Sequence, residues 1–344
     1  MPSVPFASAL QPAVDLFKQL STIKPKEPKL TIGLDIGSSS VKALALGPRK
    51  GGGLRPILGQ RVAPLESGQE TDASDAVKTA VGGLLVPVQT VNLAVSGPWV
   101  IMRIVEMPTM KPAEMKQALP FEAQRYLPFN IQDVIIDGAT LGPADANKSW
   151  VLIVACKKEL IERRLDWVRR AGFSVDLIDV DALAMANAFL ANEIGKSDTT
   201  IRALVNIGAQ LTNVVIFQGE VPYLVRDIPW GGEKLARGIA DQLGAEADAV
   251  SQALAQGEPP PEIVNAMKPA TEALITELQL SFDYFENRFS QPPEALFVSG
   301  GVSVVPGLVE AIKSHLTQTV NPWSPAKGLS GQFTVAYGLA LRTQ

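Results

Sequence analysis

The sequence predicts an α/β protein made of two related halves, each built around a strand–turn–strand unit. Residues 30–46 read LTIGLDIGSSSVKALAL and residues 201–218 read IRALVNIGAQLTNVVIFQ, so the same apolar–turn–apolar pattern occurs twice. When the copies are aligned, Asn206 stands where Asp35 stands and Gly208 where Gly37 stands. A third glycine turn, VSGG at 298–301, follows a predicted strand. Repetition of a whole unit indicates a duplicated domain more strongly than either copy alone.

The composition is that of a globular protein without nucleic-acid or zinc chemistry. The 344 residues are 46% hydrophobic and 19% charged, which suits two domains with substantial cores. A net charge of −4 argues against a nucleic-acid partner. Cys156 and His315 are the only cysteine and histidine, so we expect no disulfide framework or zinc site, as in a reducing cytoplasm. We expect Cys156 in the core and His315 on the surface.

Residues 1–29 are expected to form an N-terminal helix and a linker. Phe6, Leu10, Val14 and Phe17 recur at helical spacing, and a stiff lysine- and proline-rich stretch follows at 24–29. Neither a secretory signal nor an apolar run of membrane-spanning length is expected. Two interpretations stay open: a helix docked on the body or frayed from it, and a weak anchor on an anionic inner-membrane surface.

The first domain is expected over 30–195, with a small unit inserted at about 99–158. The inserted unit reads strand–helix–strand–strand, and Gly172 is a helix-stop signal after it. Outside the insert we predict strands at 30–46 (two), 54–62, 90–95 and 175–180, and helices at 73–85, 159–171 and 182–191. Within it we predict strands at 100–107, 133–141 and 150–156, with a helix from Lys111 to Leu127.

The second domain is expected over 199–330, after a boundary at 195–198. It is predicted to contain strands at 201–218 (two), 220–227 and 296–299, and helices at 233–243, 245–255 and 262–289, with another beginning at Pro306. The last segment, 331–344, is predicted to return to the first domain as an apolar helix at 333–341.

The first turn carries the residues of a phosphate site. Gly37 allows the backbone to approach a ligand, and Ser38, Ser39 and Ser40 add hydroxyl and N–H donors. Asp35 can hold Mg²⁺ through water, and Lys42 can add positive charge. From sequence alone, Lys42 can equally be a solvated strand residue. Asp181 precedes a predicted helix, where an N-cap role competes with a nucleotide or metal role.

Three glycine turns in this order, with two repeated hairpin domains, resemble the actin-like ATPase superfamily, whose fold is ribonuclease H-like. Six segments carry a closer resemblance to the PilM family of type IV pilus assembly, over about residues 30–342. Each segment alone is weak evidence for the family, but six segments in the same order are specific to it. They are GLDIGSSSVKAL at 33–44, EAQRYLPFNIQDVIID at 122–137, AGFSVDLIDVDALAMANAF at 171–189, RDIPWGGEKLA at 226–236, VSGGVSVVPGL at 298–308 and VAYGLALR at 335–342.

This resemblance implies that ATP and Mg²⁺ bind between the domains. It implies a first phosphate motif at 33–42, a second at 206–213 and an adenosine motif at 300–302, with Asp181 and residues 337–339 in the hinge segments. The implied nucleotide-binding residues are Asp35 (also the metal residue), Gly37, Ser38, Ser39, Ser40, Lys42, Asn206, Gly208, Thr212, Gly231, Gly232, Lys234, Gly300, Gly301 and Val302.

Two positions depart from the superfamily pattern. Where the second phosphate motif usually has an aspartate, this chain has Asn206, and Leu211 replaces a small polar residue. A neutral amide attracts Mg²⁺ much less than a carboxylate. We therefore expect ATP to be bound but hydrolysed slowly or not at all.

The resemblance also implies a partner for the insert: the N-terminal cytoplasmic peptide of a PilN-like inner-membrane protein, which would recruit a cytoplasmic scaffold to the inner membrane. Phe121, Tyr126 and Phe129 are candidates for the peptide groove, although they also suit the core of the insert. Two alternatives stay open: an FtsA-like cell-division protein, which would need a C-terminal amphipathic helix, and a sugar-kinase-type enzyme, which would need a carboxylate base.

Overall fold

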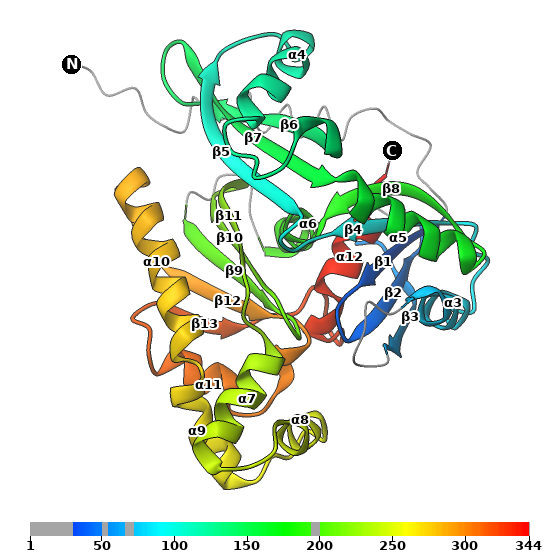
Figure 1. Ribbon diagram of the computed structural model, residues 1–344, viewed down its shortest axis with the longest axis vertical. Helices are drawn as coiled ribbons and strands as arrows, with labels where there is room; N and C mark the ends of the chain where they lie inside the picture. Colours follow the sequence, from blue (N-terminus) through cyan, green and yellow to red (C-terminus); the bar gives the residue numbers. More distant parts are fainter. Residues whose placement is uncertain (1–29, 50–53, 66–71, 194–199, 344) are drawn as a thin grey trace.

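A computed structural model describes residues 30–49, 54–65, 72–193 and 200–343 of the protein. The expected helix at 4–20, the linker at 24–29 and the boundary at 195–198 lie outside these residues. The described residues form two five-stranded sheets and one three-stranded sheet (Figure 1). No helix in these ranges is long and apolar enough to cross a bilayer.

The first sheet has the strand order β3-β2-β1-β4-β8. β1, β2 and β3 form an antiparallel meander, while β4 and β8 run parallel to β1. Helices α3 and α5 pack on one face of the sheet, and α6 and α12 pack on the other. The strands are β1 (Thr31–Ile36), β2 (Ser40–Leu46), β3 (Ile57–Pro64), β4 (Thr90–Val95) and β8 (Ser174–Val180); the helices are α3 (Ser74–Gly82), α5 (Lys158–Arg170), α6 (Asp181–Glu193) and α12 (Thr334–Leu341).

The second sheet repeats this topology as β11-β10-β9-β12-β13. Its first three strands are again an antiparallel meander and its last two run parallel to β9, which confirms the repeat predicted from sequence. The strands are β9 (Ile201–Ile207), β10 (Thr212–Gln218), β11 (Val221–Ile228), β12 (Ala295–Ser299) and β13 (Thr319–Pro322); the helices are α7 (Gly232–Leu243), α8 (Ala247–Ala255), α9 (Pro261–Ala270), α10 (Glu272–Phe289) and α11 (Leu308–Lys313).

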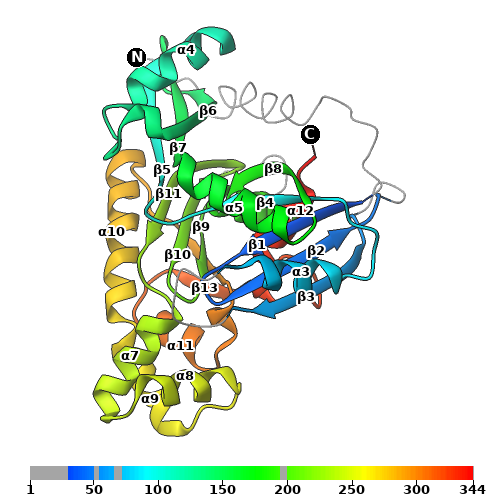
Figure 2. The ribbon, with the colours of Figure 1, turned by 45° about the vertical axis from the view of Figure 1, so that its right-hand side comes forward.

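The insert is a three-stranded antiparallel sheet of order β5-β7-β6 with one helix, as predicted. It has its own small core, in which Met115 and Leu119 of the helix pack against Val151 and Ile153. In Figures 1 and 2 it projects from the two five-stranded sheets, with α4 on its outer side. Its elements are β5 (Val100–Pro108), α4 (Pro112–Ala123), β6 (Val134–Pro143) and β7 (Lys148–Lys157).

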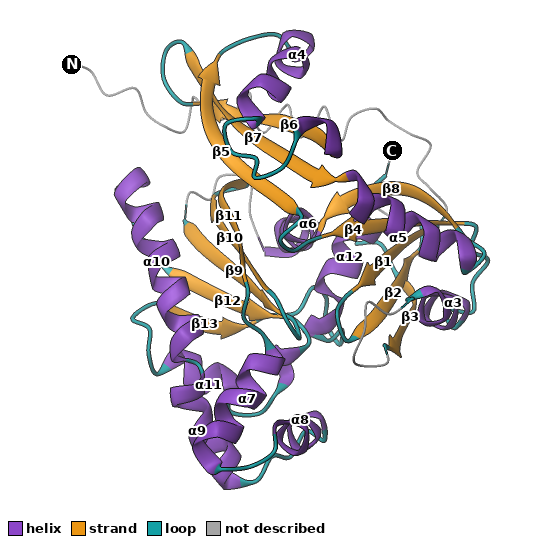
Figure 3. Ribbon diagram, viewed as in Figure 1, coloured by secondary structure: helices purple, strands orange, loops and turns teal. Residues whose placement is uncertain are grey.

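Helices α6 and α12 pack between the two large sheets (Figure 3). One apolar cluster combines Leu44 of the first sheet, Phe217 of the second, Phe189 of α6 and Tyr337 of α12. The helices touch backbone to backbone, because a Cβ on Gly338 would lie 1.7 Å from the carbonyl oxygen of Ala184. The two halves are therefore held together by a shared core, in which α6 and α12 are packed tightly against each other.

Several element predictions are wrong in detail. The helix predicted at 262–289 is two helices, α9 and α10, which meet at Thr271 because Pro269 cannot continue the hydrogen-bonding of α9. The helix predicted from Pro306 begins at Leu308, after Gly307 with φ +87°. Strand β13 was not predicted, since it has only four residues.

The single cysteine and histidine also have defined positions. Cys156 is buried, as predicted, and burial raises the pKa of its thiol to about 11. His315 is half-buried rather than solvated, with Nε2 3.1 Å from the carbonyl oxygen of Lys268. Neither residue lies in the candidate site described below.

Candidate functional site

The first turn places a buried carboxylate next to its countercharge. Asp35, the next-to-last residue of β1, is 7% exposed and pairs with Lys42 across the hairpin, with Nζ 3.3 Å from Oδ2. The same Nζ donates to the carbonyl oxygen of Ser40 at 3.3 Å. A Cβ on Gly37 would lie 2.9 Å from this Nζ, so glycine leaves room for the ammonium group. Lys42 therefore reaches the turn, while Ser38 and Ser39 are exposed on it.

The second turn has the backbone of the first turn without its charge pair. The N–H of Gly208 donates to the carbonyl oxygen of Leu211 at 2.9 Å, just as Gly37 donates to Ser40 at 3.1 Å. Asn206 takes the place of Asp35, and its Nδ2 donates to Oδ1 of Asn213 at 3.1 Å. An amide–amide hydrogen bond thus replaces an ion pair.

The second turn is also locked against the start of α7. The N–H of Gly232 donates to the carbonyl oxygen of Gly208 at 3.0 Å, and that of Glu233 donates to Ala209 at 2.9 Å. A Cβ on Gly231 would lie 2.4 Å from the carbonyl oxygen of Gly208. The first N–H groups of α7 therefore hold the turn. Thr212 is fully buried, and its hydroxyl donates to the carbonyl oxygen of Trp230 at 2.7 Å.

A carboxylate on β11 joins the second turn to the first half of the chain. Asp227 accepts hydrogen bonds from Nδ2 of Asn213 at 2.8 Å and from the N–H of Gly97 at 3.1 Å. Gly97 lies between β4 and β5, at the entry to the insert. Sequence analysis quoted Asp227 within RDIPWGGEKLA but gave it no role, because only the fold brings it next to Gly97.

Asp181, the first residue of α6, responds to the charges of Asp35 in the first hairpin and Asp227 on β11. Its pKa is raised to about 7, chiefly because its carboxyl group is desolvated. The negative charges of Asp35 and Asp227 raise this pKa further, whereas a hydrogen bond from Ser96 and the charge of Arg164 oppose the shift. We call Asp35, Asp181, Asp227, Asn206 and Asn213 the carboxylate junction.

The junction brings together residues that lie far apart in the sequence and links the two turns. Desolvation also raises the pKa of Asp227, against the effect of its two hydrogen bonds. Partly desolvated carboxylates that lie close together are unfavourable in their charged form without a cation. The arrangement can therefore accept a divalent ion or an ion-bound phosphate, and perturbed carboxylates of this kind are typical of functional sites.

The Mg²⁺ predicted at Asp35 fits this donor set only as an ion shared with phosphate and water. Among the described residues, no group of three or more His, Cys, Asp and Glu side chains is placed to hold a metal ion alone. Magnesium ions bound to nucleotides commonly take one or two carboxylates and complete their coordination with water and phosphate oxygens. Asp35 and Asp181, which interact electrostatically, are the residues that would hold such an ion.

The third glycine turn packs directly on the second repeat. Gly300 has φ +101°, and a Cβ there would lie 2.4 Å from the carbonyl oxygen of Ile207, so only glycine fits. Gly301 is exposed beside it. A Cβ on Gly232 would lie 2.9 Å from a methyl group of Val302. The fold thus brings together the predicted adenosine residues and the start of α7.

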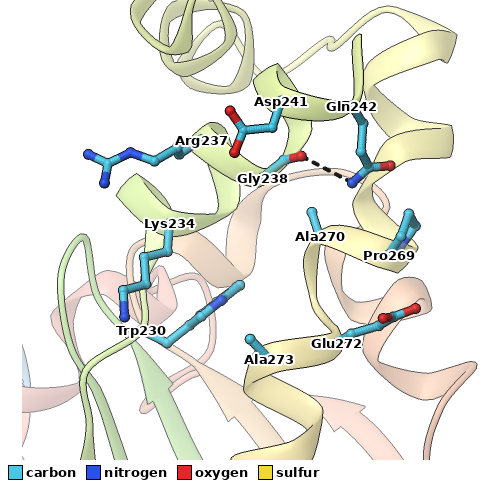
Figure 4. Close-up of a pocket in the computed structure, with 10 residues that line it drawn as sticks. All are labelled: Trp230, Lys234, Arg237, Gly238, Asp241, Gln242, Pro269, Ala270, Glu272 and Ala273. Carbon is cyan, nitrogen blue, oxygen red and sulfur yellow. Dashed lines mark hydrogen bonds between the residues drawn. The ribbon is translucent and has the colours of Figure 1, made fainter. Parts of the chain in front are cut away.

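Lys234 points into an open cavity on the outer side of α7. The cavity has a volume of about 520 Å³ and lies between α7 and the junction of α9 with α10 (Figure 4). Figure 4 shows Lys234 above Trp230, with Arg237 and Asp241 further along the same helix. Its lining residues are Trp230, Lys234, Arg237, Gly238, Asp241, Gln242, Pro269, Ala270, Glu272 and Ala273.

The three aromatic candidates of the insert lie in different environments. Phe121 is 78% exposed on α4. Tyr126 packs against the insert core, and its hydroxyl donates to Glu122 at 3.0 Å. Only Phe129 lines a hollow, of about 480 Å³, whose wall also includes Lys157. The Nζ of Lys157 lies 4.6 Å from the ring centroid of Phe129 and 3.9 Å from that of Trp99.

Two five-stranded sheets of identical strand order, joined by packed helices and each supplying one turn to a shared junction, define an actin-like ATPase fold. The family model described as type IV pilus assembly protein PilM matches residues 33–344. The chain belongs to this family. The resemblance stated from the six sequence segments is therefore confirmed.

Two solved structures support the fold. The structure described as the PilM-PilN type IV pilus biogenesis complex is 25% identical, has a TM-score of 0.78 and covers 90% of this chain and 97% of its own. The ethanolamine utilization protein EutJ from Carboxydothermus hydrogenoformans is 14% identical, has a TM-score of 0.58 and covers 97% of this chain and 98% of its own. The second similarity shows the fold alone.

Proposed function

We propose that the chain is an ATP-binding scaffold of type IV pilus assembly that recognises the N-terminal cytoplasmic peptide of a PilN-like inner-membrane protein. The observation that carries the nucleotide part is the carboxylate junction. It links both repeated turns through Asp35, Asp181 and Asp227. Family membership supports the pilus part of the proposal.

In this proposal the two turns bind the phosphates from opposite sides. Gly37 and the serines after it approach one side, and Lys42 supplies positive charge. Gly208 approaches the other side. The third turn at Gly300 and Gly301 lies beside α7 and is proposed to contact the adenosine. Mg²⁺, when bound, would neutralise the phosphate charge and the buried carboxylates together.

The uncharged side chains of the second turn are the reason to expect slow or absent ATP turnover. Asn206 is hydrogen-bonded to Asn213, and neither side chain carries a charge that would attract Mg²⁺ or accept a proton from water. Asp227, the neighbouring carboxylate, already accepts two hydrogen bonds. We therefore propose binding of ATP as the functional event, rather than rapid hydrolysis.

The proposed partner surface is the hollow in the insert that is lined by residues 127–130, Asp133 and Lys157. Phe129 gives it an aromatic wall, and Lys157 and Asp133 give it one positive and one negative charge. The related structure at 25% identity is a PilM-PilN complex, which supports a PilN-like peptide as the occupant. Recruitment of a cytoplasmic protein to the inner membrane face would follow from that partner.

The proposal is tested by isothermal titration of the full chain with ATP–Mg²⁺ and then with PilN-like N-terminal peptides. We expect one ATP site and a peptide affinity that falls in Phe129→Ala but not in Phe121→Ala, a matched aromatic control on the exposed side of α4. No heat of ATP binding at millimolar nucleotide would refute the nucleotide part. Equal peptide affinity in both variants would refute the hollow as the partner surface.

A further inference from the structure

We infer that Arg164 on α5 binds the terminal phosphate of the nucleotide and thereby connects the nucleotide site to the insert. The inference rests on the proposed function. It adds one nucleotide-binding residue and a structural connection, through α5, from the nucleotide site to the insert. No sequence motif points to Arg164, which lies in the charged stretch KELIERRLDWVRR.

The guanidinium group of Arg164 is fixed against the first phosphate turn. Its Nη1 donates to the carbonyl oxygen of Ile36 at 2.7 Å, one residue before Gly37. Trp167, one helical turn later on α5, lies under it with 5.2 Å between the guanidinium carbon and the ring centroid. The head group is therefore held in one orientation next to the turn.

The other edge of the guanidinium is ready for an anion. Nε of Arg164 is buried and has no hydrogen-bond partner among the described residues. Nε and Nη2 form the edge with which arginine makes paired hydrogen bonds to phosphate. Leaving a buried charged donor without an acceptor is costly, so an unpaired Nε indicates a missing acceptor.

No carboxylate of the described residues forms an ion pair with Arg164, although two lie near it. Asp181 and Asp35 attract Arg164 electrostatically, yet no ion pair joins Arg164 to a carboxylate in the described structure. Burial lowers the pKa of Arg164, and the nearby Arg163 adds to this. Lys42 already neutralises Asp35 at 3.3 Å. Arg164 is thus a second cation at the first turn whose hydrogen-bonding edge is not used by Asp35.

Helix α5 gives this contact a route to the insert. It starts at Lys158, directly after β7, whose last residue Lys157 lies on the rings of Trp99 and Phe129 (Figure 1). Arg164 lies seven residues further on, about 10 Å along a helix. A phosphate bound at Arg164 is therefore connected to the rings of Trp99 and Phe129 through a single helix.

The test compares Arg164→Gln with Arg169→Gln, which removes the same charge from an exposed position on the same helix. Titration of the full chain should show ATP affinity about tenfold weaker in Arg164→Gln, with ADP affinity changed by less than about threefold. The control should change neither. Peptide affinity should depend on ATP in the wild type and in the control, but not in Arg164→Gln.

The outcomes separate this inference from the proposed function. Equal loss of ATP and ADP affinity, or no loss of either, overturns the terminal-phosphate contact although ATP binding stands. Absence of ATP binding by the wild type overturns the proposed function itself. If Arg164→Gln does not fold, Arg164→Lys keeps the charge without the paired donors, and unchanged ATP affinity in that variant would overturn the inference.

Discussion

The two repeated turns have the same backbone hydrogen bond but different means of support. In the first turn a flexible ammonium group fills the space next to Gly37, and a buried ion pair joins Asp35 to Lys42. At the second turn the N–H groups of Gly232 and Glu233 bind the carbonyl oxygens of Gly208 and Ala209, and asparagines replace the charges. The first turn therefore carries the charged side chains, whereas the second turn is held mainly by backbone hydrogen bonds within its own domain.

The largest difference is expected in stability when a methyl group is added at Gly37 of the first turn or at Gly231, which packs against the second turn. Gly231→Ala should lower the free energy of unfolding by about 2–4 kcal/mol, since its Cβ would overlap backbone atoms of Gly208 and Ala209. Gly37→Ala should cost under about 1 kcal/mol, because the Nζ of Lys42 can move away. Urea denaturation of both variants measures the contrast, and equal losses would contradict it.

The next difference concerns Mg²⁺ and charge. Asp35→Asn should weaken ATP–Mg²⁺ binding by about 30- to 100-fold, since it removes the buried carboxylate and leaves Lys42 without its partner. Asn206→Asp should instead strengthen Mg²⁺-dependent binding by about tenfold and raise the ATPase rate, because it supplies the missing charge of the second turn. Calorimetry with and without Mg²⁺ checks both values; a loss of affinity in Asn206→Asp would count against this assignment.

A further expected effect is a pH dependence of the carboxylate junction. Because folding raises the pKa of Asp181 from 3.8 to about 7, the folded state binds more protons than the unfolded state in this range. Stability should therefore fall as pH rises from about 4 to about 7 and then level off. ATP–Mg²⁺ binding should show the opposite trend and strengthen toward pH 8, since the ionised carboxylate attracts the ion.

Asp181→Asn removes this titration and serves as the control. Melting temperatures of the variant should decline less than those of the wild type between pH 4 and pH 7. The hydrogen bond between residue 181 and Ser96 remains possible with an amide. Parallel pH profiles of the two proteins would show that Asp181 is not the titrating group.

Local patterns predicted the repeated sheets well, whereas contacts between distant segments escaped prediction. The hairpins at 30–46 and 201–218 could be predicted because strand alternation and glycine turns are local signals. The break between α9 and α10 is also local, at Pro269, and was overlooked. The four-residue strand β13 depends on pairing with β12, and a short segment of this kind has no local pattern that predicts a strand.

In the candidate site, too, residues of one local motif were predicted, whereas residues from distant segments were not. Asp35, Gly37 and Lys42 lie in one motif and were all predicted, although only the structure placed Lys42 at the turn. Asp227 and Arg164 reach the junction from elements more than a hundred residues away from the first turn, so no spacing pattern could reveal them. The binding roles of the predicted residues and the domain boundaries stay predictions.

The contact between Gly338 and Ala184 ties α12, the last helix of the described chain, to α6. Backbone touches backbone there, with no side chain whose rotation could absorb a sliding displacement. Since both helices also pack on the first sheet, we expect them to move with that sheet as one unit. A change in the angle between the two halves would then have to occur where these helices meet the second sheet.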